Sequence, residues 1–114
     1  MTPVEVVGIF YRAMANRDKA ALRSVLADNF SFKGPMMTFD GPDSFVDAMM
    51  NPPFEASITN SQFITDGMRV AHTFVWNMTA PARAEIPMCE VLTLRGSRVL
   101  HSILFFDTQQ FPVG

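Results

Sequence analysis

A single acid, Glu90, lies in an otherwise apolar stretch near the end of the chain. A carboxyl group buried among apolar side chains has a raised pKa unless a cation or hydrogen bonds compensate, so it can hold a proton near neutral pH. Such a group can donate that proton to a ligand, or act as the ionised partner of a histidine. The same acid could also satisfy a buried indole or backbone group and carry no catalytic role.

Strand alternation predicts the neighbours of Glu90. Every second side chain of a strand lies on the same face, which groups His72, Phe74 and Trp76 in one strand and places Ser102 on the corresponding face of another. We predict that Glu90 lies opposite Phe74, with His72 and Trp76 as diagonal neighbours and Ser102 close by. Glu90 and His72 are therefore the predicted catalytic pair, although a histidine on an apolar strand face is also a common core residue.

Four long strands and a shorter one must position these groups. Apolar and polar residues alternate in the short segment 30–33, which runs into a Gly-Pro break. The long strands are predicted at 54–65, 68–79, 84–94 and 98–108, with turns at 66–67 and 95–97 and a loop around Pro81. A one-residue slip in pairing would send every side chain to the opposite face, so register decides the site.

Three helices precede the long strands. Thr2 and Glu5 form a predicted capping box for a first helix that ends near Asn16. Asp18 is a predicted N-cap for a second helix, which runs to residues 28–29. The pair Gly41-Pro42 opens a third helix and the prolines at 52–53 close it. The order of elements predicts one α+β domain over residues 1–114, with a cone-shaped, half-open antiparallel sheet packed on three N-terminal helices.

Composition narrows the classes of partner. The 114 residues are 48% hydrophobic, and nine basic against 11 acidic residues give a net charge of −2. No basic run interrupts this mixture, so we expect neither nucleic acid nor membrane as a partner. The apolar content and the two apolar faces of the last strand favour a homodimer. One cysteine, Cys89, and no secretion signal are typical of a cytoplasmic protein.

Apolar side chains between the sheet and the helices are predicted to line a pocket for a small hydrophobic ligand. Methionine suits such a wall, because its side chain adapts to irregular shapes. No spacing of His, Cys and acids predicts a metal site, and no motif predicts a cofactor. The predicted lining residues are Phe10, Tyr11, Met14, Phe32, Phe45, Met49, Phe74, Trp76, Met88, Ser102, Leu104 and Phe106.

The order of elements, together with Asp18, the segment 30–35, the segment 89–94 and the ending Phe105-Phe106-Asp107-Thr108, resembles a known superfamily. The chain is similar to nuclear-transport-factor-2-like proteins of the SnoaL-like polyketide cyclase and ketosteroid isomerase type. The resemblance implies a cone-shaped α+β barrel, usually dimeric, with a pocket between the sheet and the helices.

Carried over residue by residue, the resemblance matches at one polar position. The family's buried acid on the third long strand corresponds to Glu90, whereas its catalytic base corresponds to Gly34 and its helical tyrosine to Phe10. An acid that related hydrolases and cyclases carry on the last strand corresponds to Leu104. These departures argue against the steroid-isomerase reaction. Asp107 ends the last strand on the other face and is predicted to accept backbone hydrogen bonds at the chain end.

Two functions therefore remain open. The first is a cofactor-free enzyme of isomerase, cyclase or hydrolase type that acts on a small hydrophobic carbonyl or polyketide-like compound, with Glu90 as acid or oxyanion stabiliser and His72 as base. The second is a non-catalytic dimeric domain that binds a hydrophobic ligand or a protein. The residues do not decide whether the protein is an enzyme.

Overall fold

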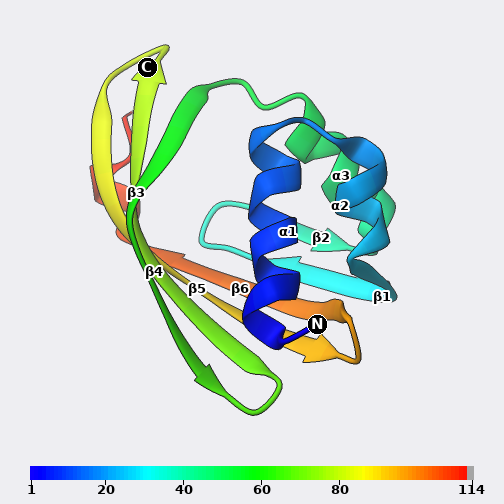
Figure 1. The fold of residues 1–114 in the computed structure, drawn as a ribbon. Helices are drawn as coiled ribbons and strands as arrows, with labels where there is room; N and C mark the ends of the chain where they lie inside the picture. Colours follow the sequence, from blue (N-terminus) through cyan, green and yellow to red (C-terminus); the bar gives the residue numbers. More distant parts are fainter. Residues whose placement is uncertain (113–114) are drawn as a thin grey trace.

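The computed structural model describes residues 1–112, which form a curved mixed sheet with helices packed on its concave side (Figure 1). The helices are α1 (Pro3–Ala15), α2 (Lys19–Ser24) and α3 (Pro42–Met50), and a short 3-10 helix, η1 (Thr108–Gln110), follows the sheet. The strands are β1 (Leu26–Lys33), β2 (Thr38–Asp40), β3 (Glu55–Asp66), β4 (Arg69–Ala80), β5 (Ala84–Arg95) and β6 (Arg98–Phe106), and their order across the sheet is β2-β1-β6-β5-β4-β3. The predicted open α+β cone is confirmed.

The sheet is not wholly antiparallel, which corrects one part of the prediction. Strands β3 to β6 form the expected antiparallel meander, whereas β1 lies parallel to β6, with Phe32 opposite Ser102. This pairing places the first strand of the chain, β1, next to the last one, β6. A strand of the N-terminal half thereby becomes part of the wall that carries the candidate site.

The helix starts follow from their capping residues. The Thr2 hydroxyl accepts a hydrogen bond from the Glu5 N–H at 3.2 Å, and the Glu5 carboxylate accepts one from the Thr2 N–H at 2.9 Å, so the predicted capping box is confirmed. Asp18 caps α2 by accepting from the Ala21 N–H at 3.1 Å. Pro42 is the first residue of α3, as predicted.

Three parts of the prediction differ from the structure, each for its own physical reason. Helix α2 ends at Ser24, and residues 26–29, predicted as the end of that helix and its stop, belong to β1. Leu26 is fully buried and pairs with Val99 of β6, so tertiary contact outweighs local helix propensity. The strand β2 was not predicted, because three residues give too short a pattern. Strand β6 ends at Phe106 because Asp107 caps η1.

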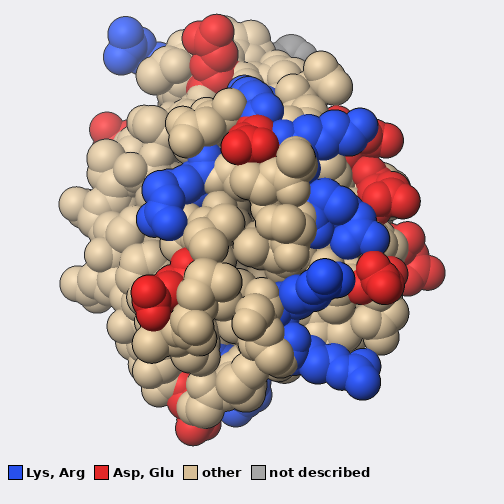
Figure 2. Space-filling view, turned by 45° about the vertical axis from the view of Figure 1, so that its right-hand side comes forward, with Lys and Arg blue, Asp and Glu red and all other residues tan. Residues whose placement is uncertain are grey.

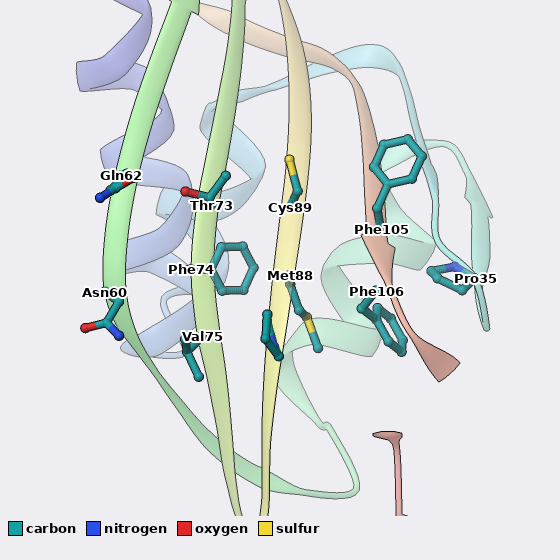
Figure 3. A pocket seen from close by; sticks show the side chains of 11 residues that line it. Pro35, Asn60, Gln62, Thr73, Phe74, Val75, Met88, Cys89, Phe105 and Phe106 are labelled. Atoms are coloured by element: carbon teal, nitrogen blue, oxygen red, sulfur yellow. The ribbon is translucent and has the colours of Figure 1, made fainter. Parts of the chain in front are cut away.

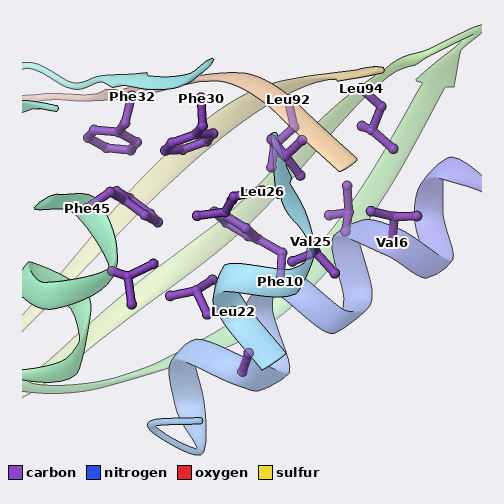
Figure 4. Packing of buried hydrophobic residues seen from close by; sticks show 14 of the residues in the cluster. Val6, Phe10, Leu22, Val25, Leu26, Phe30, Phe32, Phe45, Leu92 and Leu94 are labelled. Carbon is purple, nitrogen blue, oxygen red and sulfur yellow. The ribbon is translucent and has the colours of Figure 1, made fainter. Parts of the chain in front are cut away.

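Apolar side chains fill the space between the helices and one end of the sheet. Phe10 of α1, Leu22 of α2, Phe30 of β1 and Leu92 of β5 are fully buried and converge from four elements (Figure 4). Phe45 of α3 packs on this group and stacks on Phe10 with ring centroids 5.9 Å apart. We call this region the filled end, and it anchors the helices to the sheet.

Charged side chains of both signs are interspersed on the face shown in Figure 2, beside a broad area that carries neither. Arg23 illustrates the mixture, since it bridges Asp28 and Asp43 at 3.0 and 3.2 Å. Within residues 1–112, no helix is long and apolar enough to cross a membrane.

Candidate functional site

A cavity of about 550 Å³ lies between the sheet and the helices, at the end opposite the filled end. Its wall is largely apolar, and Glu90 and Tyr11 bring carboxyl and hydroxyl groups to it. Met36 and Met37, in the loop between β1 and β2, are exposed and form part of its rim. Other lining residues are Met14, Phe32, Phe45, Met49, Phe74, Trp76, Met88, Leu104 and Phe106.

Glu90 is the polar centre of this cavity. Its side chain is only 5% exposed, and its two carboxyl oxygens have separate partners: the Tyr11 hydroxyl donates to Oε1 and the Ser102 hydroxyl donates to Oε2. Burial raises the pKa of Glu90, and the hydrogen bonds from Ser102 and Tyr11 partly oppose this shift. Burial and the adjacent Glu90 carboxyl raise the pKa of Tyr11 well above its ordinary value, so the phenol stays neutral. The arrangement can hold and donate a proton.

His72 lies directly opposite Glu90, but in the described part of the chain their side chains form no hydrogen bond with each other. Its Nε2 is 2.9 Å from the Ser61 hydroxyl, and its Nδ1 is buried without a partner. The ring stacks on Phe63 with centroids 4.4 Å apart and meets the edge of Tyr11 at the same distance. Burial lowers the pKa of His72 to about 4, which leaves the imidazole neutral at pH 7.

The structure does not bring the side chains of the predicted pair, Glu90 and His72, into hydrogen-bond contact. His72 faces Ser61 and several aromatic rings and does not line the cavity. With a pKa of about 4, its imidazole is too weak a base to remove a proton from water or from most C–H groups. The partners of Glu90 are Tyr11 and Ser102. Ser102 lies near Glu90 as predicted, although directly opposite Leu92.

The faces of β4, β5 and the part of β6 from Ser102 to Phe106 were predicted correctly, while the β4–β5 register was off by two residues. Val99, predicted on the outer face of β6, is fully buried because the β5–β6 register shifts after Thr93. Met88 lies opposite Phe74, and Glu90 lies opposite His72. A shift of two keeps every side chain on its own face, so Glu90 still faces the helices. Burial of alternate residues along β5 confirms that parity.

Most predicted lining residues do border the cavity, with two exceptions. Phe10 is fully buried in the filled end, and Ser102 lies behind Glu90. His72, predicted as a catalytic residue, is 2% exposed and does not line the cavity. Tyr11, adjacent to Phe10 on α1, is the residue that carries a hydroxyl into the cavity.

Loop residues complete the wall and were not predicted. Strand and helix periodicity says nothing about side chains beyond the ends of an element, and most of these residues lie at such ends or in turns, whereas Ile58 and Met78 belong to β3 and β4. Two adjacent methionines after the Gly34-Pro35 break were a usable signal, because exposed apolar pairs often border a binding site. The unpredicted lining residues are Gly34, Pro35, Met36, Met37, Pro53, Phe54, Ile58, Met78, Pro81, Ala82, Phe111 and Pro112.

The opposite face of the sheet carries a second hollow, a shallow groove of about 700 Å³ (Figure 3). Thr73, Val75 and Cys89 lie along it with Phe105, which is 53% exposed. It contains no carboxyl or basic side chain, so the candidate acid–base groups lie on the inner face. Among residues 1–112, no cluster of three His, Cys, Asp or Glu side chains could hold a metal ion.

A family model for the SnoaL-like domain matches residues 7–102. The chain belongs to the SnoaL-like domain family. The match covers most of α1, all elements from α2 to β5 and the part of β6 up to Ser102, and it confirms the resemblance that the order of elements indicated. A comparison with curated proteins found no significant match.

Solved structures show the same fold at low sequence identity. An NTF2-like protein from Burkholderia pseudomallei K96243 aligns with a TM-score of 0.84 and 21% identity over 96% of this chain and 94% of its own. A candidate polyketide cyclase from Pseudomonas putida KT2440 aligns at 0.82 with 16% identity, covering 97% and 96%. An LEH-like epoxide hydrolase from M. tuberculosis aligns at 0.80 with 18% identity, covering 95% and 84%. This SnoaL-like domain thus shares its NTF2-like fold with proteins of several different activities.

Proposed function

We propose that this SnoaL-like protein is a cofactor-free enzyme that acts on a neutral hydrophobic compound with a carbonyl or similar oxygen, and that Glu90 and Tyr11 bind and polarise that oxygen. The observation that carries the proposal is the buried Glu90 carboxyl at the cavity wall, bonded to Tyr11 and Ser102. A donor fixed in a water-poor site stabilises negative charge that develops on a substrate oxygen.

The number of protons shared by Glu90, Tyr11 and Ser102 supports a donor role for this group. With Glu90 protonated, the carboxyl group and the hydroxyls of Tyr11 and Ser102 hold three protons, and the two hydrogen bonds among them use two. One proton remains for a ligand. Ser102 does not line the cavity, so that proton is presented by Tyr11 or Glu90. With Glu90 ionised, both protons are used internally and the group can only accept.

The cavity wall also restricts the charge of the ligand. Among the described lining residues there is no Lys, Arg or His. An anionic ligand would enter without a counterion, beside a carboxyl group, and would lose hydration that nothing replaces. A neutral compound meets no such cost.

The described wall carries no second carboxyl group and no His, Lys or Arg, which favours reactions in which the substrate supplies its own nucleophile or base. An intramolecular ring closure or a bond rearrangement needs one polarised oxygen and a fixed conformation. Isomerase and cyclase types of reaction fit this requirement better than hydrolysis, which needs a base to activate water.

Replacing Glu90 by Gln tests the proposal. The amide has nearly the shape of the acid but cannot transfer a proton, so turnover of an active compound should fall by roughly 10²-fold or more while the fold is kept. The probes are a cyclic enone, a lactone and an epoxide, each neutral. Glu85→Gln, an exposed change on the same strand, is the matched control and should leave the rate unchanged.

A second function, ligand binding without turnover, is favoured by one observation: the described cavity wall carries a single carboxyl and no base. The chain's only tryptophan, Trp76, lines the cavity and reports occupancy by fluorescence. Saturable binding of the three probes without conversion, with weaker binding in Glu90→Gln, would replace the enzymatic proposal by this one.

We further propose that the protein is a homodimer that associates through the outer face of the sheet. Exposed Ile64, Ile103 and Phe105 lie on that face, and pairing places Val91 beside Ile103 and Cys89 beside Phe105. A contiguous apolar surface of this kind is typical of a subunit interface.

A further inference from the structure

Beyond β6, the chain turns back onto the sheet through a short segment, Asp107–Pro112, which we call the tail segment. The Asp107 carboxylate accepts a hydrogen bond from the Gln109 N–H at 3.0 Å, as predicted for this residue, and the Asp107 carbonyl accepts one from the Gln110 N–H at 3.1 Å. The Phe111 N–H donates to the Thr108 carbonyl at 3.2 Å. These bonds form a single capped turn that sets the direction of Phe111.

Phe111 closes a group of aromatic rings at one end of the cavity. Its ring stacks on Trp76 of β4 with centroids 5.7 Å apart, and lies 6.2 Å from Phe106 and 6.4 Å from Phe54. Phe54 in turn meets Trp76 edge-on at 5.0 Å. All four rings line the cavity and come from four separate segments. We call this group the aromatic wall.

The aromatic wall begins a short way along the sheet from the acid. Trp76 is four residues along β4 from His72, which is directly opposite Glu90, whereas Phe106 lies opposite Met88, two residues from Glu90. A strand rises about 3.3 Å per residue, so Phe106 is about 7 Å and Trp76 about 13 Å along the strands from the level of Glu90. A ligand whose oxygen is held at Glu90 therefore places its far end against the aromatic wall when its body spans these distances. A ligand with a longer body collides with the rings.

The four rings are not equally fixed. Trp76 belongs to β4, which pairs with a neighbour on each side, and Phe106 is the last residue of β6. Phe111 is half-buried and is joined to the sheet by one turn. Phe54 precedes β3 and Phe111 follows η1, so these two rings lie outside the strands, and Phe111 is the one that a single turn joins to the sheet.

We propose that Phe111 is a specificity-determining residue that limits the length of the ligand, and that Asp107 is the positioning residue that holds it over the end of the cavity. The proposal rests on the proposed function in one respect: the oxygen of the ligand is anchored at Glu90. The substrate class becomes narrower, namely neutral compounds with one terminal oxygen and a hydrophobic body that spans the distance from Glu90 to the aromatic wall.

Straight-chain methyl ketones of increasing length test the length limit, with Trp76 fluorescence as the binding signal. Affinity should rise with chain length, reach a maximum and then fall. In Phe111→Ala the maximum should move to longer ketones, which should bind at least tenfold more tightly than they do to the unchanged protein. Phe111→Leu should move it less. Asp107→Ala should shift the maximum in the same direction while leaving the affinity for short ketones unchanged.

Brominated ketones test the orientation, since bromine quenches indole fluorescence only at close range. Bromine at the tail should quench Trp76 strongly, and bromine beside the carbonyl should quench it weakly. Phe63→Ala is the matched control, because Phe63 stacks on His72 outside the cavity and its loss should leave the maximum where it was.

An unchanged maximum in both Phe111 variants, with circular dichroism showing that they are folded, would overturn the proposal. Failure of the proposed function looks different. If Glu90 does not hold the oxygen, Glu90→Gln leaves ketone affinity unchanged and both bromine positions quench equally, while the maximum still moves in Phe111→Ala.

Discussion

The filled end and the cavity end lie between the same sheet and the same helices, yet only one of them is closed by side chains. At the filled end, Phe10, Leu22 and Phe30 approach from different elements and leave no exposed surface. At the cavity end, Met49 and Trp76 are half-buried and loops form much of the wall. Helices packed on one sheet can therefore enclose a closed core, which stabilises the fold, at one end of the interior and a cavity at the other end.

The sharpest test of this separation is to shorten one side chain at each end. Phe30→Ala should lower the free energy of unfolding by about 3–5 kcal/mol, since it opens a cavity in a closed core. Met49→Ala, beside existing space, should cost about 1 kcal/mol or less. Urea unfolding of both variants measures the difference. Equal losses would show that the two ends are not energetically distinct.

Dependence on pH should arise from buried titratable side chains outside the filled end, because the described core residues of that end carry none. Burial lowers the pKa of His72 from 6.5 to about 4, so between these values the unfolded chain binds more protons than the folded one. The contribution of His72 to the free energy of unfolding is therefore fully present above pH 6.5, and up to about 3 kcal/mol of it is lost as the pH falls towards 4. Unfolding measured across this range checks the effect.

His72→Phe is the control for that titration, since it keeps a ring on Phe63 and removes the proton site. Its stability should be flatter between pH 6.5 and 4. Glu90 acts in the opposite direction: its raised pKa means that the folded state holds a proton longer, so its contribution is complete at low pH and is lost as the pH rises. Glu90→Gln removes that second slope, and a profile unchanged in both variants would contradict these assignments.

Ion pairs outside the filled end should matter much less than its core. Arg23 joins Asp28 and Asp43 at the surface and donates to the Leu26 carbonyl at 3.1 Å. Exposed pairs of this kind contribute about 0–1 kcal/mol, so Arg23→Ala should lower the melting temperature only slightly, and less in high salt. If Arg23→Ala lost as much stability as Phe30→Ala, the surface ion pairs would stabilise the filled end as much as its core does.

The outer face of the sheet should contribute least to the stability of the single chain. Phe105→Asp should change the unfolding free energy of the monomer by about 0.5 kcal/mol or less. Light scattering after size exclusion should nevertheless show a shift from dimer to monomer, since the charge enters the proposed interface. Thr108→Asp, beyond the end of β6, is the control and should leave the mass unchanged. A monomeric unchanged protein would exclude the dimer.

The strands and the parity of their side chains were predictable because one face of the sheet is buried, which forces alternation on the sequence. Glu90 and Ser102 were placed on the correct inner face for this reason. The helix starts were equally accessible, because Thr2 and Asp18 cap through local bonds.

The hydrogen-bond partners of Glu90 were harder to predict, because they depend on distances between elements. The choice of Tyr11 over His72 follows from the rotation of α1 and from a shift of two residues between β4 and β5, neither of which changes the hydrophobic pattern. Phe111 escaped prediction because the turn at Asp107, after the last strand, decides where it points. Periodicity describes elements, whereas this site is completed where elements end.

The parallel pairing of β1 with β6 bears on how the molecule assembles during synthesis. Leu26 and Phe32 find their partners, Val99 and Ser102, only after most of the chain has left the ribosome. The helices and β1 emerge early but cannot seal the filled end until the last strand arrives. Closing such a long loop is slow compared with forming hairpins. Apolar surface of the N-terminal third thus waits for the C-terminal strand, and that interval is when the nascent protein is most exposed to aggregation.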